Sequence, residues 1–449
     1  MRWKKPKQLT PTQYIILGYL AAILIASVIL MLPISLEEGQ ELSYIDSLFT
    51  ATSSVSVTGL TVVNVKDTFT TFGEIIMLIL FLLGGIGIIT LGTFLYLLLG
   101  RNISLSYRQL IMIDQNRNQL SGLVQLMRLV IFLSLIFVLI STVLFGLYFY
   151  IRGYFDNVLT ALYYGLFHSI SSYTNAGFDI FGNSLQDFSH DYIVQLLTML
   201  LIIIGAIGFP VLIEVREYLF GKHSNFRFTL FTKLTTFTFF ILLVIGTVGI
   251  FILENSLYYA NMAWHEKLFY SLFNSVTARS GGLSTMDVSE YSSATQIFMS
   301  VLMFIGASPS SVGGGIRTTT FAIILLTFMT YAVGRTEVRV FRRSIKQSDM
   351  IKSFVIITGG IMLVITSLIV LQAVEPDKSI NAIIFEIASA FGTCGLSMGI
   401  TPDLSNIGKL IIMLLMFMGR IGIFSLLYLF RTKKKKETYH YPKEDIIIG

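Results

Sequence analysis

The sequence predicts an all-α integral membrane protein with eight membrane spans. Four tandem helix–re-entrant pore loop–helix repeats are expected to surround one pore with pseudo-fourfold symmetry. The first observation is composition: 54% of residues are hydrophobic and 13% are charged, against about 25% charged in soluble domains. The second is a set of eight apolar stretches long enough to cross a hydrocarbon layer of ~30 Å. The third is one polar motif that occurs four times between them.

The apolar stretches form four successive pairs, one pair for each repeat. They lie at residues 14–33, 72–99, 124–151, 191–213, 234–253, 295–330, 354–374 and 408–430. The first is too long for a signal-peptide core and lacks a small-residue cleavage site, so we interpret it as a retained helix. The repeats are expected at 11–100, 120–220, 230–334 and 349–432, followed by a basic cytoplasmic tail at 433–449.

The polar motif lies between the two helices of each pair and ends in one glycine. Its copies cover residues 49–59, 167–177, 272–282 and 385–395. The segments before the glycines are typical of short helices, at 47–55, 165–173, 270–278 and 383–391. A small-residue step then follows in each second helix, beginning at Gly84, Gly205, Gly306 and Gly419. One such step is ordinary membrane-helix packing, whereas four in register favour copies of one unit.

Basic residues predict the orientation. The N-terminal tail, the three segments between repeats and the C-terminal tail hold 24 of the 32 Lys and Arg residues. The positive-inside rule places these segments, and both termini, in the cytoplasm of a cell whose plasma membrane the chain crosses several times. The four motifs must then enter from outside. Most acidic residues also fall outside, among them Asp46, Asp67, Asp179, Asp187, Asp287 and Asp403, and a negative outer mouth would concentrate cations.

The motif tips are suited to binding a bare monovalent cation. Non-helical backbone at membrane depth must be buried in protein or line a watery cavity, and glycine lets carbonyl groups turn toward one axis. A ring of such carbonyls can replace the hydration shell of K⁺. No carboxylate lies in the tips, which disfavours a divalent ion, and Na⁺ is the alternative. Polar contacts between helices are the structural alternative to a pore. The candidate filter residues are Val57, Thr58, Gly59, Asn175, Ala176, Gly177, Ser280, Gly281, Gly282, Thr393, Cys394 and Gly395.

These tips resemble the Trk/Ktr/HKT potassium transporter superfamily over essentially the whole chain. The likeness is strongest to the bacterial Ktr membrane subunit (KtrB/KtrD type). It implies that Gly59, Gly177, Gly282 and Gly395 are the filter glycines. In the plant branch a serine at the first of these positions goes with sodium preference, so glycine implies potassium. The third tip departs from the usual Thr-Ala-Gly-Phe, because it reads Ser280-Gly281-Gly282-Leu283.

The second helix of the third repeat is expected to break at residues 306–320. Proline removes a helix donor and three consecutive glycines make a helix costly there, so this segment should lie in the conduction path. The resemblance implies a gate here and places Arg420 in the pore below the filter, whereas a static kink is the alternative. The candidate gate residues are Gly306, Ser308, Pro309, Gly313, Gly314, Gly315 and Arg420. We expect Arg420 to act as an electrostatic barrier and Arg279 to brace the filter backbone.

The predicted function is potassium uptake by the ion-translocating subunit of a Ktr-type system, with Na⁺ as an activator or co-ion. The resemblance implies a homodimer docked on a separate cytoplasmic ring of nucleotide-binding subunits (KtrA/KtrC type). No P-loop is present, so ATP hydrolysis within the chain is not expected, and neither is a nucleic-acid partner. The tail from Arg431 to Lys436 either contacts anionic lipid of the bilayer or stops translocation.

Two other classes of function remain as alternatives. A coupled symporter also uses broken helices, but such folds usually show inverted or two-part repeats. An intramembrane enzyme would need a nucleophile with a base or a metal cluster. Cys394 has no nearby His in sequence and His168 lies in another repeat, so both are interpreted as structural residues.

Overall fold

The computed structural model describes residues 10–98, 122–221 and 226–423, with a few single positions outside these ranges. Helices make up all the described elements except one short hairpin, which confirms the all-α class. Four described helices are long and apolar enough to cross a membrane alone. They are the first helices of the four repeats: α1 (Pro11–Leu30), α7 (Leu123–Ile151), α11 (Leu230–Glu254) and α15 (Gln347–Val374).

A short, largely buried helix precedes each loop glycine, as the sequence predicts. These pore helices are α2 (Tyr44–Ser56), α8 (Val158–Thr174), α12 (Trp264–Thr277) and α16 (Ile380–Gly392). Ser43, Asn157 and Ser379 cap three of them by accepting a backbone N–H in the first turn, the role such short polar side chains commonly have. In α12, where the preceding residue is an alanine, the Glu266 carboxylate accepts the Ala263 N–H instead at 3.0 Å.

The second helix is interrupted in the first and second repeats as well as in the third. Gly87 separates α4 (Thr71–Ile86) from α5 (Ile88–Leu98), and α9 (Tyr192–Ala206) bends by 103° into α10 (Phe209–Phe220) at Gly208. In the third repeat a thirteen-residue loop, 305–317, joins α13 (Ser293–Phe304) to α14 (Thr318–Ala332). In the fourth, α17 (Asn406–Ile421) ends at Gly422.

Left-handed glycines explain the breaks in the first, second and fourth repeats. The prediction that only the second helix of the third repeat is broken is therefore wrong. Gly87, Gly208 and Gly422 have φ values of 101°, 102° and 85°, which a right-handed helix cannot include. The stretches 72–99, 191–213 and 408–430 are therefore not continuous helices. The total of eight membrane crossings stays a prediction. It holds if each interrupted second helix crosses the membrane once.

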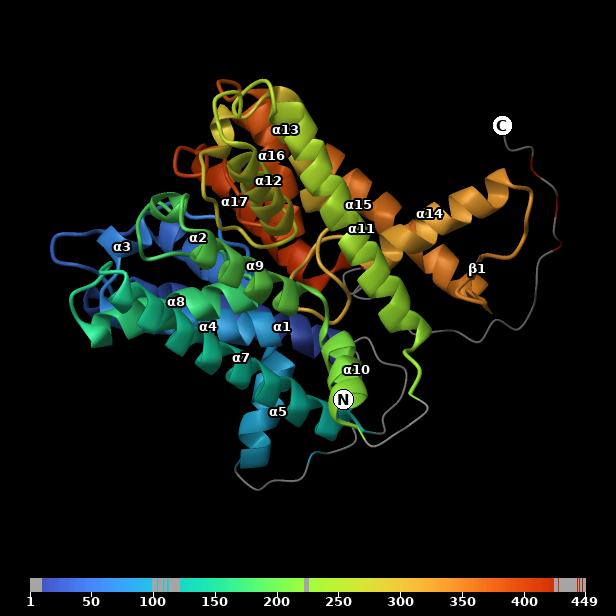
Figure 1. Ribbon diagram of the computed structural model, residues 1–449, viewed down its shortest axis with the longest axis horizontal. Coiled ribbons are helices and arrows are strands. Elements are labelled where there is room, and N and C mark those ends of the chain that lie inside the picture. The colour runs from blue at the N-terminus through green and yellow to red at the C-terminus, as the bar shows by residue number, and fades with distance from the viewer. Residues whose placement is uncertain are drawn as a thin grey trace, which may run out of the picture.

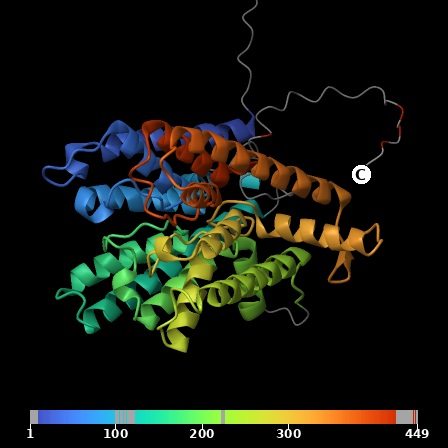
Figure 2. The same cartoon turned by 90° about the horizontal axis from the view of Figure 1, so that it is seen from above.

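The repeats form a closed ring. Each second helix packs against the pore helix of the next repeat: α4 on α8, α9 on α12, α13 on α16, and α17 on α2. In Figure 2 the first repeat (blue) lies beside the fourth (red), and the second and third (green to yellow) share the other side. This cyclic order is the predicted pseudo-fourfold arrangement. Figure 1 shows α14 and the hairpin extending away from this ring.

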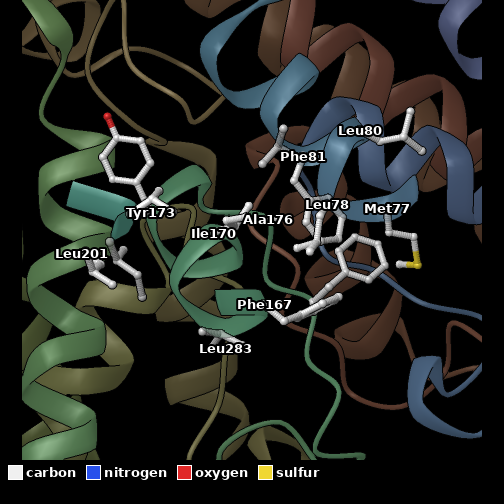
Figure 3. Packing of buried hydrophobic residues seen from close by; sticks show 14 of the residues in the cluster. Met77, Leu78, Leu80, Phe81, Phe167, Ile170, Tyr173, Ala176, Leu201 and Leu283 are labelled. Carbon is white, nitrogen blue, oxygen red and sulfur yellow. The ribbon is translucent and has the colours of Figure 1, made fainter. Parts of the chain in front are cut away.

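The remaining elements are short and lie in the connections. They are η1 (Pro33–Ser35), α3 (Val65–Thr68), η2 (Gln186–Phe188), η3 (Val288–Glu290) and the antiparallel strands β1 (Arg339–Val340) and β2 (Arg343–Ser344). Aromatic packing fills the seam between the first two repeats. Phe81 stacks on Phe178 with ring centroids 4.9 Å apart and meets the edge of Phe167 at 5.9 Å. Ala176, a candidate filter residue, belongs to the same cluster (Figure 3).

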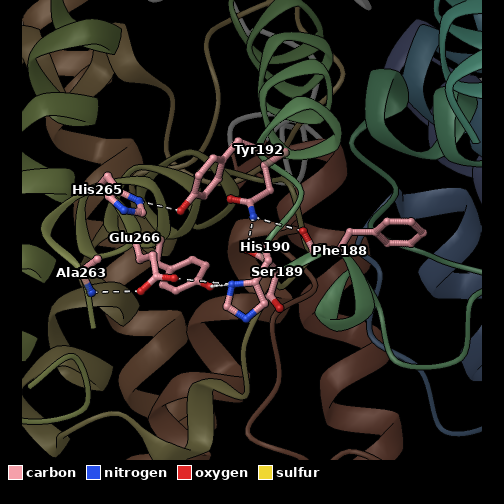
Figure 4. A network of polar contacts seen from close by, with 9 residues as sticks. Phe188, Ser189, His190, Tyr192, Ala263, His265 and Glu266 are labelled. Atoms are coloured by element: carbon pink, nitrogen blue, oxygen red, sulfur yellow. Dashed lines mark hydrogen bonds and ion pairs between the residues drawn. The ribbon is translucent and has the colours of Figure 1, made fainter. Parts of the chain in front are cut away.

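Polar contacts between helices join the first repeat to the second, the second to the third and the fourth to the first. Glu74 of α4 accepts a hydrogen bond from Tyr163 of α8. The Tyr192 hydroxyl of α9 and the Nδ1 atom of His265 in α12 lie 2.8 Å apart, beside the contact of His190 with Glu266 (Figure 4). Lys409 Nζ of α17 lies 2.7 Å from Asp46 Oδ1 of α2, and both side chains are largely buried. This last pair joins the fourth repeat to the first.

We expect Lys409→Met to lower the free energy of unfolding by about 2 kcal/mol, because it leaves the Asp46 carboxylate poorly solvated and without its cation. The Lys378–Asp403 pair is a matched control at 3.2 Å, with Asp403 mostly exposed, so Lys378→Met should cost less than about 1 kcal/mol. Thermal unfolding in detergent measures both. Equal loss in the two variants would contradict a special role for the pair that closes the ring.

Candidate functional site

The four loops share one backbone conformation at the predicted tips. In each, a non-glycine residue two positions before the glycine is left-handed, which is uncommon for such residues. The φ values are 57° at Val57, 57° at Asn175, 84° at Ser280 and 48° at Thr393. The glycines that follow are also left-handed, with φ of 95° at Gly59, 72° at Gly177, 73° at Gly282 and 99° at Gly395.

The four glycines meet in a closed ring, although more than 300 residues separate the first from the last. A Cβ atom built on Gly59 would lie 2.6 Å from the Ala176 carbonyl oxygen, and one on Gly177 would lie 2.9 Å from Gly282 Cα. One on Gly282 would lie 2.5 Å from the Cys394 oxygen, and one on Gly395 would lie 3.0 Å from Gly59 Cα. Because carbonyls and Cα atoms of neighbouring loops occupy the space of a side chain, only glycine fits without a backbone shift.

Serines of the pore helices hold three of the loops. The N–H groups of Thr58, Ala176 and Cys394 donate to the carbonyls of Ser53, Ser171 and Ser389, at 2.9, 2.8 and 2.8 Å. In the first and fourth loops the serine hydroxyl also accepts the glycine N–H, at 3.1 Å for Gly59 and 3.0 Å for Gly395. These serines thus bind the loop of their own repeat. If the polar residues served only as contacts between helices, such bonds to the loop would not be needed.

The third loop differs, as its sequence does. Helix α12 ends at Thr277, five residues before Gly282, whereas the other pore helices end three residues before their glycine. Gly281 N–H donates to the Thr277 carbonyl at 2.7 Å. The Ser280 hydroxyl donates to the Thr393 carbonyl at 2.8 Å, so this loop is hydrogen-bonded to the fourth one.

The small-residue steps are contacts between broken helices and pore helices. A Cβ atom on Gly84, Gly205 or Gly419 would collide with the carbonyl of Val55, Tyr173 or Phe391, which lies four residues before the loop glycine in each case. The sequence indicated close packing at these steps but not the breaks that follow. The second glycine of each step, at Gly87, Gly208 and Gly422, was the available signal.

The loop at 305–317 lies against the filter and against two of the breaks. Ser308 and Val312 donate N–H groups to the carbonyls of Ala206 and Gly205, at 3.0 and 3.2 Å, and Gly315 donates to Gly419 at 3.3 Å. A Cβ atom on Gly313 would lie 2.5 Å from Ser280 Oγ. One on Gly314 would lie 2.5 Å from Thr393 Oγ1. The structure therefore brings the predicted gate segment directly against two candidate filter residues.

Arg420 extends from α17 to this loop. Its guanidinium donates to the carbonyls of Val312 and Gly84, and to that of Gly85 at 3.1 Å. Arg317 donates to the Ser308 carbonyl at 3.3 Å and to that of Gly313. Both arginines line a cavity of about 100 Å³. Residues from the breaks of all four repeats line this cavity: Gly85, Ile86, Gly87, Phe209, Ser310, Ser311, Arg317, Arg420 and Ile421.

Arg279 braces a different part of the structure from the one predicted. Its fully buried guanidinium donates to the carbonyls of Phe239 at 3.2 Å and Gly306 at 3.0 Å. It also lies 4.5 Å from the centre of the Phe239 ring, a favourable cation–π distance. These hydrogen bonds go to α11 and to the start of the predicted gate segment rather than to the filter backbone. No pattern in the sequence identifies these distant carbonyls.

His168 and Cys394 are enclosed in the pore region. His168 Nε2 lies 2.8 Å from Thr198 Oγ1, which joins α8 to α9, and the Cys394 thiol donates to the Thr277 carbonyl at 3.2 Å. The described residues contain no group of three or more His, Cys, Asp and Glu side chains that could hold a metal ion.

Several acidic side chains of the predicted outer segments have hydrogen-bond or ion-pair partners within the protein. Asp46 and Asp403 pair with lysines, and Asp287 caps η3. The Asp179 carboxylate accepts N–H groups of Phe181 and Gly182, at 3.0 and 2.8 Å. Burial raises the pKa of Asp179 above its ordinary value, and these N–H groups oppose that rise. The negative outer mouth thus stays a prediction, and these four acids contribute less to it than a residue count suggests.

The chain matches the TrkH family model, described as a cation transport protein, over residues 3–440. It belongs to this family. Family membership confirms the predicted superfamily and favours transport over the enzyme alternative. The fold is also that of a solved member: the crystal structure of the potassium transporter TrkH from Vibrio parahaemolyticus superposes with a TM-score of 0.74 at 18% identity. The superposition covers 96% of this chain and 87% of the TrkH chain.

Relatives within the TrkH family match the chain from end to end. Ktr system potassium uptake protein D of Bacillus subtilis is 52% identical over 98% of both chains. Ktr system potassium uptake protein B of the same organism is 35% identical over 98% of this chain and 97% of its own. The potassium/sodium uptake protein NtpJ of Enterococcus hirae is 33% identical over 100% of this chain and 99% of its own.

Two left-handed glycines of the fourth loop offer a matched test of the ring. Gly395 and Gly399 have φ of 99° and 82°, but a Cβ atom would meet the Thr58 carbonyl at Gly395 and nothing within 4 Å at Gly399. We expect Gly395→Ala to abolish cation uptake, because neighbouring loops must move apart. Gly399→Ala should keep most of it, since only backbone strain of about 1 kcal/mol is added. Rubidium uptake measures both, and equal activity would contradict the ring.

Proposed function

We propose that this chain is the ion-translocating subunit of a Ktr-type potassium uptake system in the plasma membrane. The observation that carries the proposal is the closed ring of Gly59, Gly177, Gly282 and Gly395, all left-handed and packed backbone to backbone. The names of the relatives, which are potassium uptake proteins, support the ion and the direction of transport.

Selectivity would come from carbonyl oxygens of the twelve candidate filter residues. Left-handed residues that alternate along each tip turn successive carbonyls toward one side, where together they can replace the water around K⁺. The pore helices end next to the ring, and the negative end of each helix dipole favours a cation there. Gly59 and Gly395 donate their N–H groups to the hydroxyls of Ser53 and Ser389, and these hydrogen bonds limit collapse of the loops around a smaller ion.

Gating is assigned to residues 306–320 together with Arg420. The loop is held by three backbone hydrogen bonds to the second repeat and by one to the fourth, each worth about 1 kcal/mol net. Such a segment can leave its position at moderate cost. Arg420 contributes two effects: its donors connect the loop to the first repeat, and its positive charge lowers cation occupancy of the path.

The finer features of the system belong to the proposal. Repeats at 11–100, 120–220, 230–334 and 349–432 would act as the four walls of one pore, and the basic tail 433–449 lies outside the described residues apart from single positions. Both termini would be cytoplasmic, as the basic residues favour. A homodimer would dock on a nucleotide-binding ring of KtrA/KtrC type. The name of NtpJ includes sodium, which supports Na⁺ as a co-ion or activator.

The first test is rubidium or potassium uptake in cells that lack their own potassium uptake systems. We expect the wild-type chain to restore uptake. In Gly59→Ser, potassium uptake should fall and sodium uptake should rise, because a side chain at φ 95° displaces the Ala176 carbonyl. Unchanged transport and selectivity in properly inserted Gly59→Ser would remove the first loop from the ion path.

Arg420 can be tested with two substitutions that separate its effects. Arg420→Ala removes both charge and donors and should raise flux several-fold, the effect of removing about 1 kcal/mol of barrier. Arg420→Gln keeps a donor without charge. If flux in Arg420→Gln equals that of Arg420→Ala, the charge forms the barrier; if it stays at the wild-type level, the hydrogen bonds do. Wild-type flux in both folded variants would rule out Arg420 as part of the gate.

A further inference from the structure

A buried carboxylate lies beside the filter of the fourth repeat. Glu386 is in the middle of α16, nine residues before Gly395, and its side chain has no exposed area. The equivalent positions in the other pore helices are Thr50, His168 and Phe273. The fourth quadrant is thus the one of the four with an acid at this register. No described Lys, Arg or His pairs with Glu386 within 4.0 Å, so an ion pair does not explain its burial.

The partners of Glu386 are hydroxyl groups of the chain that leaves the filter. Ser397, two residues after Gly395, donates its hydroxyl to Oε1, and Thr401 donates to Oε2 at 3.1 Å. The two hydroxyls lie 2.9 Å apart, and Ser397 Oγ also accepts the Gly399 N–H at 2.9 Å. One carboxylate therefore binds both ends of a five-residue turn.

The segments that follow the first three tips have hydrogen bonds to neighbouring repeats. Lys66 and Asn64 of the first loop donate to the carbonyls of Phe181 and Gly182, at 3.3 and 3.4 Å. The second loop is bonded to the third, since Leu185 N–H donates to the Ser284 carbonyl at 2.9 Å. After the fourth tip, the hydrogen bonds of the described residues 397–405 all stay within the fourth repeat. Glu386 supplies to this segment the support that neighbouring repeats give to the other three.

We propose that Glu386 is a positioning residue for the fourth quadrant of the filter and sets the preference for K⁺ over Na⁺. By holding Ser397 and Thr401 it fixes the backbone that follows Gly395, and so the direction of the last carbonyls that face the ion. Loss of this support would let the loop move inward toward a smaller ion. The inference rests on the proposed potassium uptake and adds a residue outside the twelve candidate filter positions.

The test compares Glu386→Gln and Ser397→Ala with a buried acid elsewhere. Glu254 is also fully buried and accepts Ser292 N–H and hydroxyl groups at 2.9 and 2.7 Å, but it joins α11 to α13. Rubidium uptake, sodium uptake and thermal unfolding in detergent are measured for wild type, Glu386→Gln, Ser397→Ala, the double variant and Glu254→Gln. We expect the sodium-to-rubidium uptake ratio to rise about fivefold in Glu386→Gln and Ser397→Ala, the effect of one lost hydrogen bond.

Glu254→Gln should lower thermal stability about as much as Glu386→Gln does. It should leave the sodium-to-rubidium uptake ratio unchanged. The double variant should show no further rise in the ratio, because the two side chains act through one contact. A wild-type ratio in both single variants, or an equal rise in Glu254→Gln, would overturn the role of Glu386. If Glu386→Gln does not fold, Ser397→Ala decides. A wild-type chain that transports no rubidium would instead reject the proposed function.

Discussion

The structure depends on one constraint: backbone N–H and carbonyl groups need hydrogen-bond partners wherever the chain leaves the helical conformation inside the membrane. Each unpaired group would cost several kcal/mol away from water. Four pore loops and four helix breaks create many such groups. Side chains from neighbouring segments bind some of them: Ser53 and Ser389 accept glycine N–H groups, and Arg420 donates to carbonyls at two breaks. Carbonyls at the tips are the groups that the proposed function assigns to the ion.

This constraint explains the glycines at two places in each repeat, the pore loop and the second helix. In the loop, glycine lets four chains approach closely enough to form one ring. In the second helices of the first, second and fourth repeats, the first glycine of the step packs under the end of a pore helix, and the second one turns the chain away from the helix axis. Close approach and the break are thus two consequences of one motif. The third repeat has Pro309 in place of that second glycine, and there the break extends to a loop of thirteen residues.

The sequence predicted what depends on local composition. The pore helices, the loop glycines and the gate segment follow from short patterns that recur in register, and the structure places all of them together. Breaks at Gly87 and Gly208 were missed because glycine in an apolar helix is also typical of packing. Contacts between distant residues were missed for another reason. Lys409 pairs with Asp46 across 363 positions and Glu386 binds the chain after its own filter loop, and neither follows from one sequence without the fold.

The proposed filter and the proposed gate form one packed unit in the third and fourth quadrants. Ser280 donates to the Thr393 carbonyl, and Gly313 and Gly314 lie against the side chains of these same two residues. Interiors packed this closely switch between discrete arrangements rather than deforming gradually. Movement of the gate loop must therefore change what supports Ser280 and Thr393, whereas the first and second quadrants keep their serine contacts. Under the proposed function, the departure of the third loop from the common pattern is the feature that couples the gate to the selectivity filter.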